Sequence, residues 1–397
     1  MSCFFRLYIC ILLGLTNCLF AQDSKVQIIA FQGIPASHNK DENFRDLKNA
    51  GFTVNLQMYS NVDQVKRALD LCQKYGLKLI FSVPELITNP EVTISQVYNH
   101  PALLGYYITD EPGTKKFTDI NSIVDKVNRL DKKNIPYINL YPNYATNEQL
   151  EASDYNNYIV TYLKKVNAKI LSFDNYSIVN NSIRYDFYQN LEIIRANSLK
   201  FSKPFWAFAC SVIHFNYKKP TLSGLKLQQF SNLLYGAKGL QYYTYWGVND
   251  AFWKANNYGY AIVDENGRPT PTYNLVKEVN GQINRLSWIF SKSKVDSVFH
   301  VGDTIPIGTK RMNFLPSKFK EFKTLSNKAL VSFMSNGNNK YIVIMNKNLN
   351  KFLPFNYQVF QGVSMIDNNT GKSRRLSGQK QLSKIPPGDI LIFTYKN

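Results

Sequence analysis

Cysteine is scarce in this sequence of 397 residues, and its positions argue against a disulfide-stabilised scaffold. Cys3, Cys10 and Cys18 lie near the N-terminus, which leaves Cys72 and Cys210 for the rest of the chain. We expect Cys72 in a helix and Cys210 at a strand end, so no bond between them is predicted. Stability must therefore come from a large apolar core, which a chain of this length can bury.

Several catalytic motifs are also missing, and each absence excludes a class of chemistry. There is no G-x-S-x-G turn, no H-E-x-x-H zinc motif, no phosphate-binding loop and no C-x-x-C pair. Histidine is rare, and neither His214 nor His300 has metal-ligand residues beside it. We therefore predict neither a metal site nor a cofactor.

Acidic residues are in deficit relative to basic ones. The chain has 47 Lys and Arg against 28 Asp and Glu, a net charge of +19. Such a balance favours an anionic partner, either nucleic acid or an acidic polysaccharide. The basic residues are scattered in pairs such as Lys115-Lys116 and Lys218-Lys219, without the dense stripe typical of nucleic-acid binding. We predict no nucleic-acid partner; the charge reflects either surface composition or attraction for an acidic carbohydrate.

Long hydrophobic runs are absent except at the N-terminus. Arg6 precedes an apolar run from Leu7 to Phe20, and Ala21 precedes a polar segment. This order is typical of a cleavable signal peptide over residues 1–21, and a transmembrane helix would need about 20 apolar residues. The alternatives are an N-terminal core helix or a lipoprotein signal at Cys18. We expect a protein that is secreted, periplasmic or at the cell surface, without a membrane span.

Short apolar segments alternate with helical patterns from residue 22 to 291. Eight segments have the composition of buried strands: Val26–Gln32, Thr53–Tyr59, Lys78–Val83, Leu103–Thr109, Tyr137–Tyr141, Lys169–Phe173, Phe205–Ala209 and Gly239–Trp246. The helical stretches between them include Asp63–Tyr75, Asp119–Lys133, Asn147–Lys165, Ile183–Leu199 and Ser223–Ala237. This alternation indicates parallel βαβ units, and eight of them predict a closed (β/α)8 TIM barrel. An open doubly wound sheet is disfavoured because no G-x-G-x-x-G follows the first strand.

A different pattern begins near residue 292. Four strand candidates follow one another without helices: Ala329–Met334, Tyr341–Asn346, Val363–Asp367 and Gly388–Tyr395. Clusters of Asn, Ser and Gly between them predict tight turns. Residues 292–397 are therefore expected to form a small antiparallel all-β domain.

Carboxylates occur at the predicted carboxyl ends of the barrel strands, where the active sites of such barrels lie. Strand four ends in Asp110-Glu111, and strand six ends in Asp174. Cleavage of a glycosidic bond needs one carboxylic acid to protonate the leaving oxygen and a second carboxylate to attack the sugar or activate water. Asp110, Glu111 and Asp174 are therefore candidate catalytic residues, although acidic residues also cap helices and form turns.

Side chains suited to sugar binding surround these carboxylates in the predicted barrel. Aromatic rings stack on the C–H faces of a sugar, and polar side chains bond its hydroxyls. The candidate substrate-binding residues are Gln32, Gln57, Tyr59, Glu85, Asn175, Tyr176, Trp206, Tyr243 and Trp246. Packing of the barrel is the alternative explanation for Trp206, Tyr243 and Trp246, and an ordinary loop charge is the alternative for Glu85.

The segments His100–Pro112, Tyr235–Trp246 and Asp264–Tyr273 resemble clan A glycoside hydrolases, particularly glycosidases related to the family 42 β-galactosidases. The resemblance covers most of the barrel and implies a glycosidase with a C-terminal β-domain. In that clan the Glu at the end of strand four is the general acid/base, which corresponds to Glu111. The residue before it is usually Asn, and here it is Asp110.

Strand seven departs from the clan. The clan places its nucleophilic Glu there, whereas this chain has the segment Ala209–Ser211. We therefore expect Glu111 as the acid and Asp174 as the second carboxylate. A pair of carboxylates on strands four and six also resembles the arrangement in α-galactosidase-type barrels. That resemblance implies Asp110 and Asp174 as the catalytic pair of this chain. Two functions stay open: a glycoside hydrolase acting on an oligo- or polysaccharide, and a catalytically inactive carbohydrate-binding protein on the same scaffold.

Overall fold

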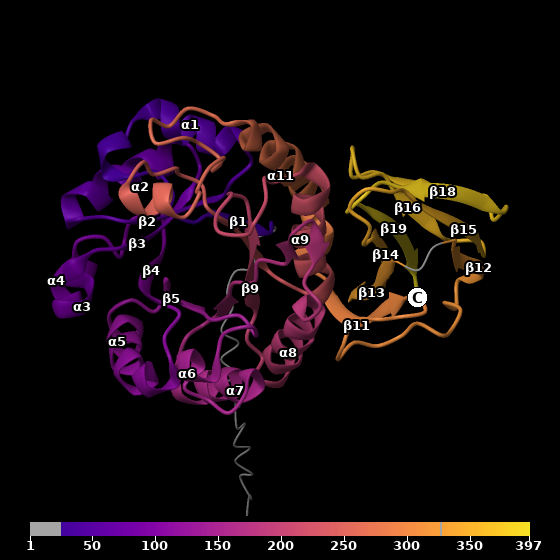
Figure 1. The fold of residues 1–397 in the computed structure, drawn as a ribbon, viewed down its shortest axis with the longest axis horizontal. Helices are drawn as coiled ribbons and strands as arrows, with labels where there is room; N and C mark the ends of the chain where they lie inside the picture. Colours follow the sequence, from indigo (N-terminus) through magenta and orange to yellow (C-terminus); the bar gives the residue numbers. More distant parts are fainter. Residues whose placement is uncertain (1–24, 326–327) are drawn as a thin grey trace, which may run out of the picture.

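The computed structural model describes residues 25–325 and 328–397, and it contains a closed eight-stranded barrel beside a β-domain (Figure 1). The barrel strands are all parallel, in the order β1-β10-β9-β6-β5-β4-β3-β2. The predicted TIM barrel with a C-terminal all-β domain is confirmed. The predicted signal peptide, residues 1–21, lies outside the described residues.

The elements alternate as the apolar pattern requires. The barrel strands are β1 (Gln27–Ala30), β2 (Val54–Met58), β3 (Lys78–Ser82), β4 (Leu103–Asp110), β5 (Ile135–Leu140), β6 (Leu171–Phe173), β9 (Phe205–Cys210) and β10 (Gly239–Tyr243). The helices are η1 (Ala36–His38), α1 (Asp41–Asn49), α2 (Val62–Lys74), α3 (Pro84–Thr88), α4 (Pro90–Ser95), η2 (Thr114–Lys116), α5 (Phe117–Leu130), α6 (Asn147–Leu150), α7 (Tyr155–Lys165), α8 (Phe187–Lys200), α9 (Leu222–Tyr235), α10 (Ala251–Ala255) and α11 (Pro271–Phe290). A short hairpin, β7 (Ile178–Val179) and β8 (Ser182–Ile183), follows β6.

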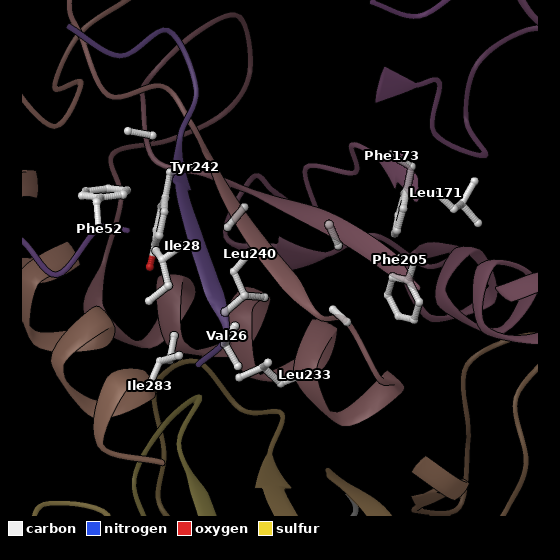
Figure 2. Close-up of a cluster of buried hydrophobic side chains, with 14 of the residues drawn as sticks. Val26, Ile28, Phe52, Leu171, Phe173, Phe205, Leu233, Leu240, Tyr242 and Ile283 are labelled. Carbon is white, nitrogen blue, oxygen red and sulfur yellow. The ribbon is translucent and has the colours of Figure 1, made fainter. Parts of the chain in front are cut away.

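The layer between the strands and the helices forms the main apolar core. Figure 2 shows Ile28 of β1 and Leu240 of β10 close to Leu233 of α9 and Ile283 of α11, and all four side chains are buried. Burial of each such side chain contributes about 1.5–3 kcal/mol relative to exposure. Apolar strands covered by helices on the outside and filled by side chains within explain the near-continuous hydrophobic runs.

One predicted helix, Asn147–Lys165, is in fact two. Glu151 ends α6 with a left-handed backbone (φ 53°), and the side chain of Asp154 then caps α7 by accepting from the amide of Asn157. An Asp side chain that caps a new helix competes with continuation of the old one. The polar segment between α6 and α7 therefore interrupts the helix.

The β-domain has more strands than the four predicted. Its larger sheet has the order β11-β13-β14-β19-β16-β17, and the smaller has the order β12-β15-β18. The strands are β11 (Lys294–Val301), β12 (Phe319–Thr324), β13 (Ala329–Asn336), β14 (Asn339–Asn346), β15 (Leu353–Val359), β16 (Ser364–Ile366), β17 (Ser373–Arg375), β18 (Gln381–Ile385) and β19 (Ile390–Lys396). The sequence analysis missed β11, β12, β15, β17 and β18, where charged residues or proline interrupt the apolar pattern.

Two smaller observations concern the described residues only. Cys72 and Cys210 are free and buried, in agreement with the expectation that they lie on different layers. Among the described helices, none combines the length and the apolar character that crossing a lipid bilayer requires.

A buried ion pair joins the β-domain to the barrel at α9. Nζ of Lys226 lies 2.9 Å from Asp389 Oδ2, and Gln282 Nε2 donates to Asp389 Oδ1 at 2.7 Å. Lys226 and Asp389 are only 9% and 6% exposed, so water does not replace these contacts. Glu278, which is more exposed, also lies 3.3 Å from Nζ of Lys226. The pair holds the β-domain against the helix that follows β9.

Replacement of Asp389 by Ala should destabilise the protein, because Lys226 and Gln282 would stay buried without their carboxylate. Removal of one partner of a buried ion pair costs about 3–5 kcal/mol, and we expect the lower part of that range because Glu278 can still pair with Lys226. Urea unfolding followed by circular dichroism measures the loss. The exposed Asp63→Ala variant is the control and should change the stability by less than about 0.5 kcal/mol; equal losses in the two variants would contradict this role.

Candidate active site

Three carboxyl side chains meet at the carboxyl ends of the barrel strands. Asp110 ends β4, Glu111 follows it directly, and Asp174 follows β6. Together with Asn139 of β5 they line a cavity of about 210 Å³. Asp174 is 5% exposed, Glu111 is half-buried and Asp110 is exposed. This is the end of the barrel at which enzymes of this fold hold their active sites.

A β-bulge in β4 turns Asp110 into the barrel. Tyr107 pairs with Tyr137 of β5, whereas Asp110 pairs with Asn139, so three steps along β4 match two along β5. Side chains alternate between the two faces of a strand. Without the extra residue Asp110 would face the helices; with it, Asp110 joins the inward row of Tyr107. Bulges next to active sites commonly re-aim a side chain in this way.

The amide of Asn139 joins the two carboxylates of neighbouring strands. Its Nδ2 donates to Asp110 Oδ1 at 3.1 Å and to Asp174 Oδ1 at 3.2 Å. Its Oδ1 accepts from the hydroxyl of Ser172 at 3.0 Å, which sets the orientation of the amide. Because both carboxylate oxygens bond to one nitrogen, they lie no more than about 6 Å apart. The amide therefore holds these two carboxyls close together on one side of the cavity.

Hydrogen bonds inside the barrel support Asn139 from below. The hydroxyl of Tyr137 donates to Gln241 Oε1 at 2.6 Å, and Gln241 Nε2 donates to Ser172 Oγ at 2.9 Å. Ser172 in turn donates to Asn139. This series of hydrogen bonds leaves the hydroxyl of Ser172 as a donor to the oxygen of Asn139. The oxygen of Asn139 therefore faces the barrel interior, and its nitrogen faces the carboxylates.

Glu111 has an unusual backbone. Its φ is 44°, in the left-handed region that residues other than glycine rarely adopt. Its amide donates to the carbonyl of Asn139 at 2.9 Å, and its carboxyl is hydrogen bonded to that of Asp174. Such a conformation costs on the order of 1–3 kcal/mol and is typical of functional positions. The strain directs the side chain across the strand ends towards Asp174.

The pKa values of the three carboxyls are raised to different extents. Burial and the charge of Asp110 raise the pKa of Glu111 to about 7. Burial, followed by the charges of Glu111 and Asp110, raises the pKa of Asp174 well above its usual range. Partial loss of hydration raises the pKa of Asp110, but hydrogen bonds from Asn139 and Tyr107 oppose this change. All three carboxyls therefore hold a proton more readily than free carboxyls, and Asp110 is the one whose ionised form hydrogen bonds from Asn139 and Tyr107 favour.

Aromatic side chains form the other wall of the cavity. The rings of Tyr176 and Tyr243 stack with their centroids 5.3 Å apart, and His214 packs edge-on against both. Tyr258 and the exposed Phe215 complete this wall. Burial lowers the pKa of His214 to about 4, so its imidazole is neutral near pH 7. A wall of this kind offers aromatic faces on which a sugar ring can stack.

Three predicted sugar-binding residues instead support the loop after β1. Oε1 of Gln32 accepts from the Thr244 hydroxyl at 2.9 Å, and Nε2 of Gln57 donates to a backbone carbonyl of that loop at 2.8 Å. The hydroxyl of Tyr59 donates to another carbonyl there at 3.2 Å, and its ring lies in the apolar core. None of the three lines the cavity. The structure places all three outside the cavity lining, where the hydrogen bonds above join them to the protein itself.

Both predicted tryptophan platforms are packing residues. Trp206 lies inside the barrel against β10, where a Cβ at Gly239 would come within 2.5 Å of its ring. Trp246 is 5% exposed and packs on His38 with ring centroids 4.8 Å apart. Neither ring reaches the cavity, and the packing alternative holds for both.

Of the remaining predicted sugar-binding residues, two lie outside the cavity lining and two line the cavity. Glu85 is exposed in the first turn of α3, away from the cavity lining. Asn175 is buried, and its Nδ2 donates to Oδ1 of Asn190 at 2.8 Å. Only Tyr176 and Tyr243, among the predicted sugar-binding residues, line the cavity with the three carboxyls.

The sequence analysis missed Asn139, His214, Phe215 and Tyr258. A signal existed for Asn139, which is the one polar residue in the apolar strand five. The other three lie outside the strands, between β9 and the last helix, where no periodicity indicates direction.

The end of β9 carries no carboxylate. Cys210 stands there, and burial raises the pKa of its thiol to about 12. A thiol that stays protonated near neutral pH is a poor nucleophile. Among the described residues, no group of three or more His, Cys, Asp or Glu side chains is arranged to hold a metal ion. The chemistry of the cavity therefore depends on its three carboxyls.

Comparison with known proteins gives the fold and little more. No protein-family model and no curated protein matches the sequence. Among solved structures, a family 30 endoxylanase from Clostridium papyrosolvens C71 superposes with a TM-score of 0.50 at 8% identity, over 94% of this chain and 96% of that one. A family 27 β-L-arabinopyranosidase from Geobacillus stearothermophilus superposes with a TM-score of 0.49 at 8% identity, over 95% and 97% of the two chains. The barrel fold is thus shared with the endoxylanase, and a link to family 42 stays a prediction.

Replacement of Asn139 by Ala should raise the pKa of both Asp110 and Asp174, because the lost amide stabilises their ionised forms. Titration of carboxyl carbons by NMR, on protein labelled with ¹³C at aspartate, measures both values. Asn175→Ala is the matched control, since that amide bonds no carboxylate. Unchanged aspartate titrations in Asn139→Ala, or equal changes in the control, would refute the bridging role.

Proposed function

We propose that the chain is a secreted glycoside hydrolase that cleaves an O-glycosidic bond with retention of the anomeric configuration. The observation that carries this proposal is the meeting of three carboxyls in one cavity, where the Asn139 amide bonds both Asp110 and Asp174 and Glu111 lies beside them. The aromatic wall opposite them suits the C–H faces of a sugar ring. The N-terminal signal pattern supports secretion.

Asp110 is the nucleophile in this proposal. It is the exposed member of the three, and hydrogen bonds from Asn139 and Tyr107 stabilise its ionised form. Its carboxylate attacks the anomeric carbon as the bond from that carbon to the leaving oxygen breaks. A covalent glycosyl ester results; the resemblance to α-galactosidase-type barrels supports a working role for Asp110, while the acid in this proposal is Glu111 and not Asp174.

Glu111 and Asp174 supply the proton. Glu111 is half-buried with a pKa of about 7, so it can be protonated before the reaction and ionised after it. It donates its proton to the leaving oxygen, and the proton held on Asp174 then hydrogen bonds to the new carboxylate of Glu111. Glu111 next removes a proton from water, which attacks the glycosyl ester and releases Asp110.

The two roles predict different losses of activity. Asp110→Asn should lower kcat/KM by about 10⁴-fold or more on every substrate, because no bond to the enzyme can form. Glu111→Gln should lower it by about 10²–10⁴-fold on alkyl glycosides, which need the proton, and far less on dinitrophenyl glycosides, which do not. A panel of hexosides and pentosides, with product stereochemistry followed by NMR, measures both.

Glu85→Gln is the control, because it removes an exposed carboxylate outside the cavity. It should leave both substrate types unaffected. Inverted products, or an Asp110→Asn variant that is selectively impaired only on alkyl glycosides, would reverse the assigned roles.

The pH dependence follows from the pKa of Glu111. Since the acid must carry its proton, kcat/KM on alkyl glycosides should fall as the pH rises above about 7. This decrease in kcat/KM at high pH should be small on dinitrophenyl glycosides and should be absent in Glu111→Gln. A decrease of equal steepness on both substrates would assign the ionisation to another group.

A carbohydrate-binding protein without turnover is the second candidate. The observation that favours it is the end of β9, where the protonated thiol of Cys210 stands in place of a carboxylate. A glycan array combined with the hydrolysis panel separates the two functions. Binding of a glycan that the wild-type chain never cleaves would support this candidate over the hydrolase.

A further inference from the structure

Two adjoining cavities lie between the barrel and the β-domain. The larger, of about 560 Å³, is lined by the β7–β8 hairpin, the start of α8 and loops of the β-domain. The smaller, of about 270 Å³, is lined by the loop after β9 and the first turn of α9. Asn181, Leu349 and Asn350 line both cavities, which therefore form one groove. We call it the interdomain groove.

The charges along the interdomain groove have one sign. Its described lining contains five basic residues and no Asp or Glu: Arg184, Lys218, Lys219, Lys328 and Lys347. None of the four lysines forms a salt bridge with a described carboxylate. The first turn of α9 adds the positive end of a helix dipole. Such a surface attracts anions even though Arg184 has Asp186 3.6 Å from its Nε.

Lys347 gives the groove a buried amino group. It is 8% exposed, and its Nζ donates to Nδ1 of His300 at 2.9 Å. Nε2 of His300 lies 3.1 Å from the hydroxyl of Tyr235, which donates to Glu192 at 3.2 Å. Burial and the charge of Lys328 lower the pKa of Lys347 to about 7. A lysine held at depth, oriented by a neutral ring and without an adjacent carboxylate, is suited to meet an anion from the cavity side.

The groove borders the proposed active site. Tyr217 lines the smaller cavity, and its ring stacks on His214 of the active-site wall with centroids 4.6 Å apart. Tyr217 also packs edge-on against Tyr176 at 5.6 Å. One layer of aromatic rings therefore separates the interdomain groove from the carboxyl cavity.

We propose that the interdomain groove binds the anionic groups of a negatively charged polysaccharide while one of its sugar units occupies the carboxyl cavity. This inference rests on the proposed function and names its substrate class. The shared chemistry is an anion on a sugar ring, either the carboxylate of a uronic acid or a sulfate ester. Exposed lysines supply attraction along the groove, and Lys347 supplies a fixed contact at its floor.

Direct binding to defined glycans tests the inference. The probes are a galacturonate oligomer, dextran sulfate and neutral dextran of matched length, titrated calorimetrically into the full chain carrying Asp110→Asn so that nothing is cleaved. We expect at least one of the two anionic probes to bind, neutral dextran to bind much more weakly, and the affinity for the anion to fall with added salt. The anionic probe that binds identifies the carboxylate or the sulfate.

Paired lysine variants locate the binding. Lys218→Gln with Lys328→Gln should raise the Kd for the anionic probe about 5- to 10-fold, since each exposed charge contributes modestly. Lys164→Gln with Lys165→Gln removes the same charge from two exposed lysines at the far end of α7 and should change the Kd by less than about 2-fold. Equal effects of the two pairs, equal binding of neutral dextran, or no binding of either anion would overturn the inference.

The proposed function has its own readout. Suppose that the wild-type chain cleaves no glycoside but binds a polyanion in a lysine-dependent manner. This result would refute the proposed hydrolase function and support anion binding in the interdomain groove. Cleavage of neutral glycosides without lysine-dependent polyanion binding would support the hydrolase function and refute anion binding in the interdomain groove.

Discussion

Nδ2 of Asn139 is shared between two carboxylates that would otherwise repel each other in a partly dehydrated pocket. The separation of Asp110 and Asp174 depends on this contact, and so does the order in which the carboxyls ionise. The amide can serve both only because Ser172 occupies its oxygen and the barrel interior orients Ser172. Because little water reaches the barrel interior, each of these hydrogen bonds is electrostatically stronger than it would be at the surface.

The barrel holds the carboxyl cavity, whereas the C-terminal β-domain lines the groove beside it. Closure of the barrel gathers strand ends that are far apart in sequence and dehydrates their carboxyls, which raises the pKa of Glu111 to about 7. The β-domain adds no residue to the carboxyl cavity. Its loops instead form one side of the interdomain groove, and the Lys226–Asp389 pair holds them against α9. The two proposals, catalysis in the carboxyl cavity and anion binding in the interdomain groove, thus concern separate parts of one molecule.

The absence of a carboxylate on β9 changes how the clan resemblance applies. Glu111 keeps the position of the clan acid, but the buried thiol of Cys210 offers no nucleophile opposite it. Asp110 stands where the clan usually has Asn, and the bulge turns it inward beside Asn139. In the proposed mechanism, the carboxylates come from Asp110 on β4 and from Glu111 and Asp174 beside it, with none from β9. The fold is shared while the pairing of carboxyls differs.

The sequence by itself determined the eight strands and the meeting of Asp110, Glu111 and Asp174 at their ends, because burial on both faces forces apolar runs and parallel strands present their ends together. It did not determine which aromatic residues face the site: Trp206 and Trp246 pack inside, whereas Tyr176 and Tyr243 line the cavity. One extra residue in a strand reverses the facing of all that follow, and no local pattern encodes such a bulge. The direction of loop residues and the meeting of scattered lysines were decided only by tertiary packing, since both depend on segments distant in the chain.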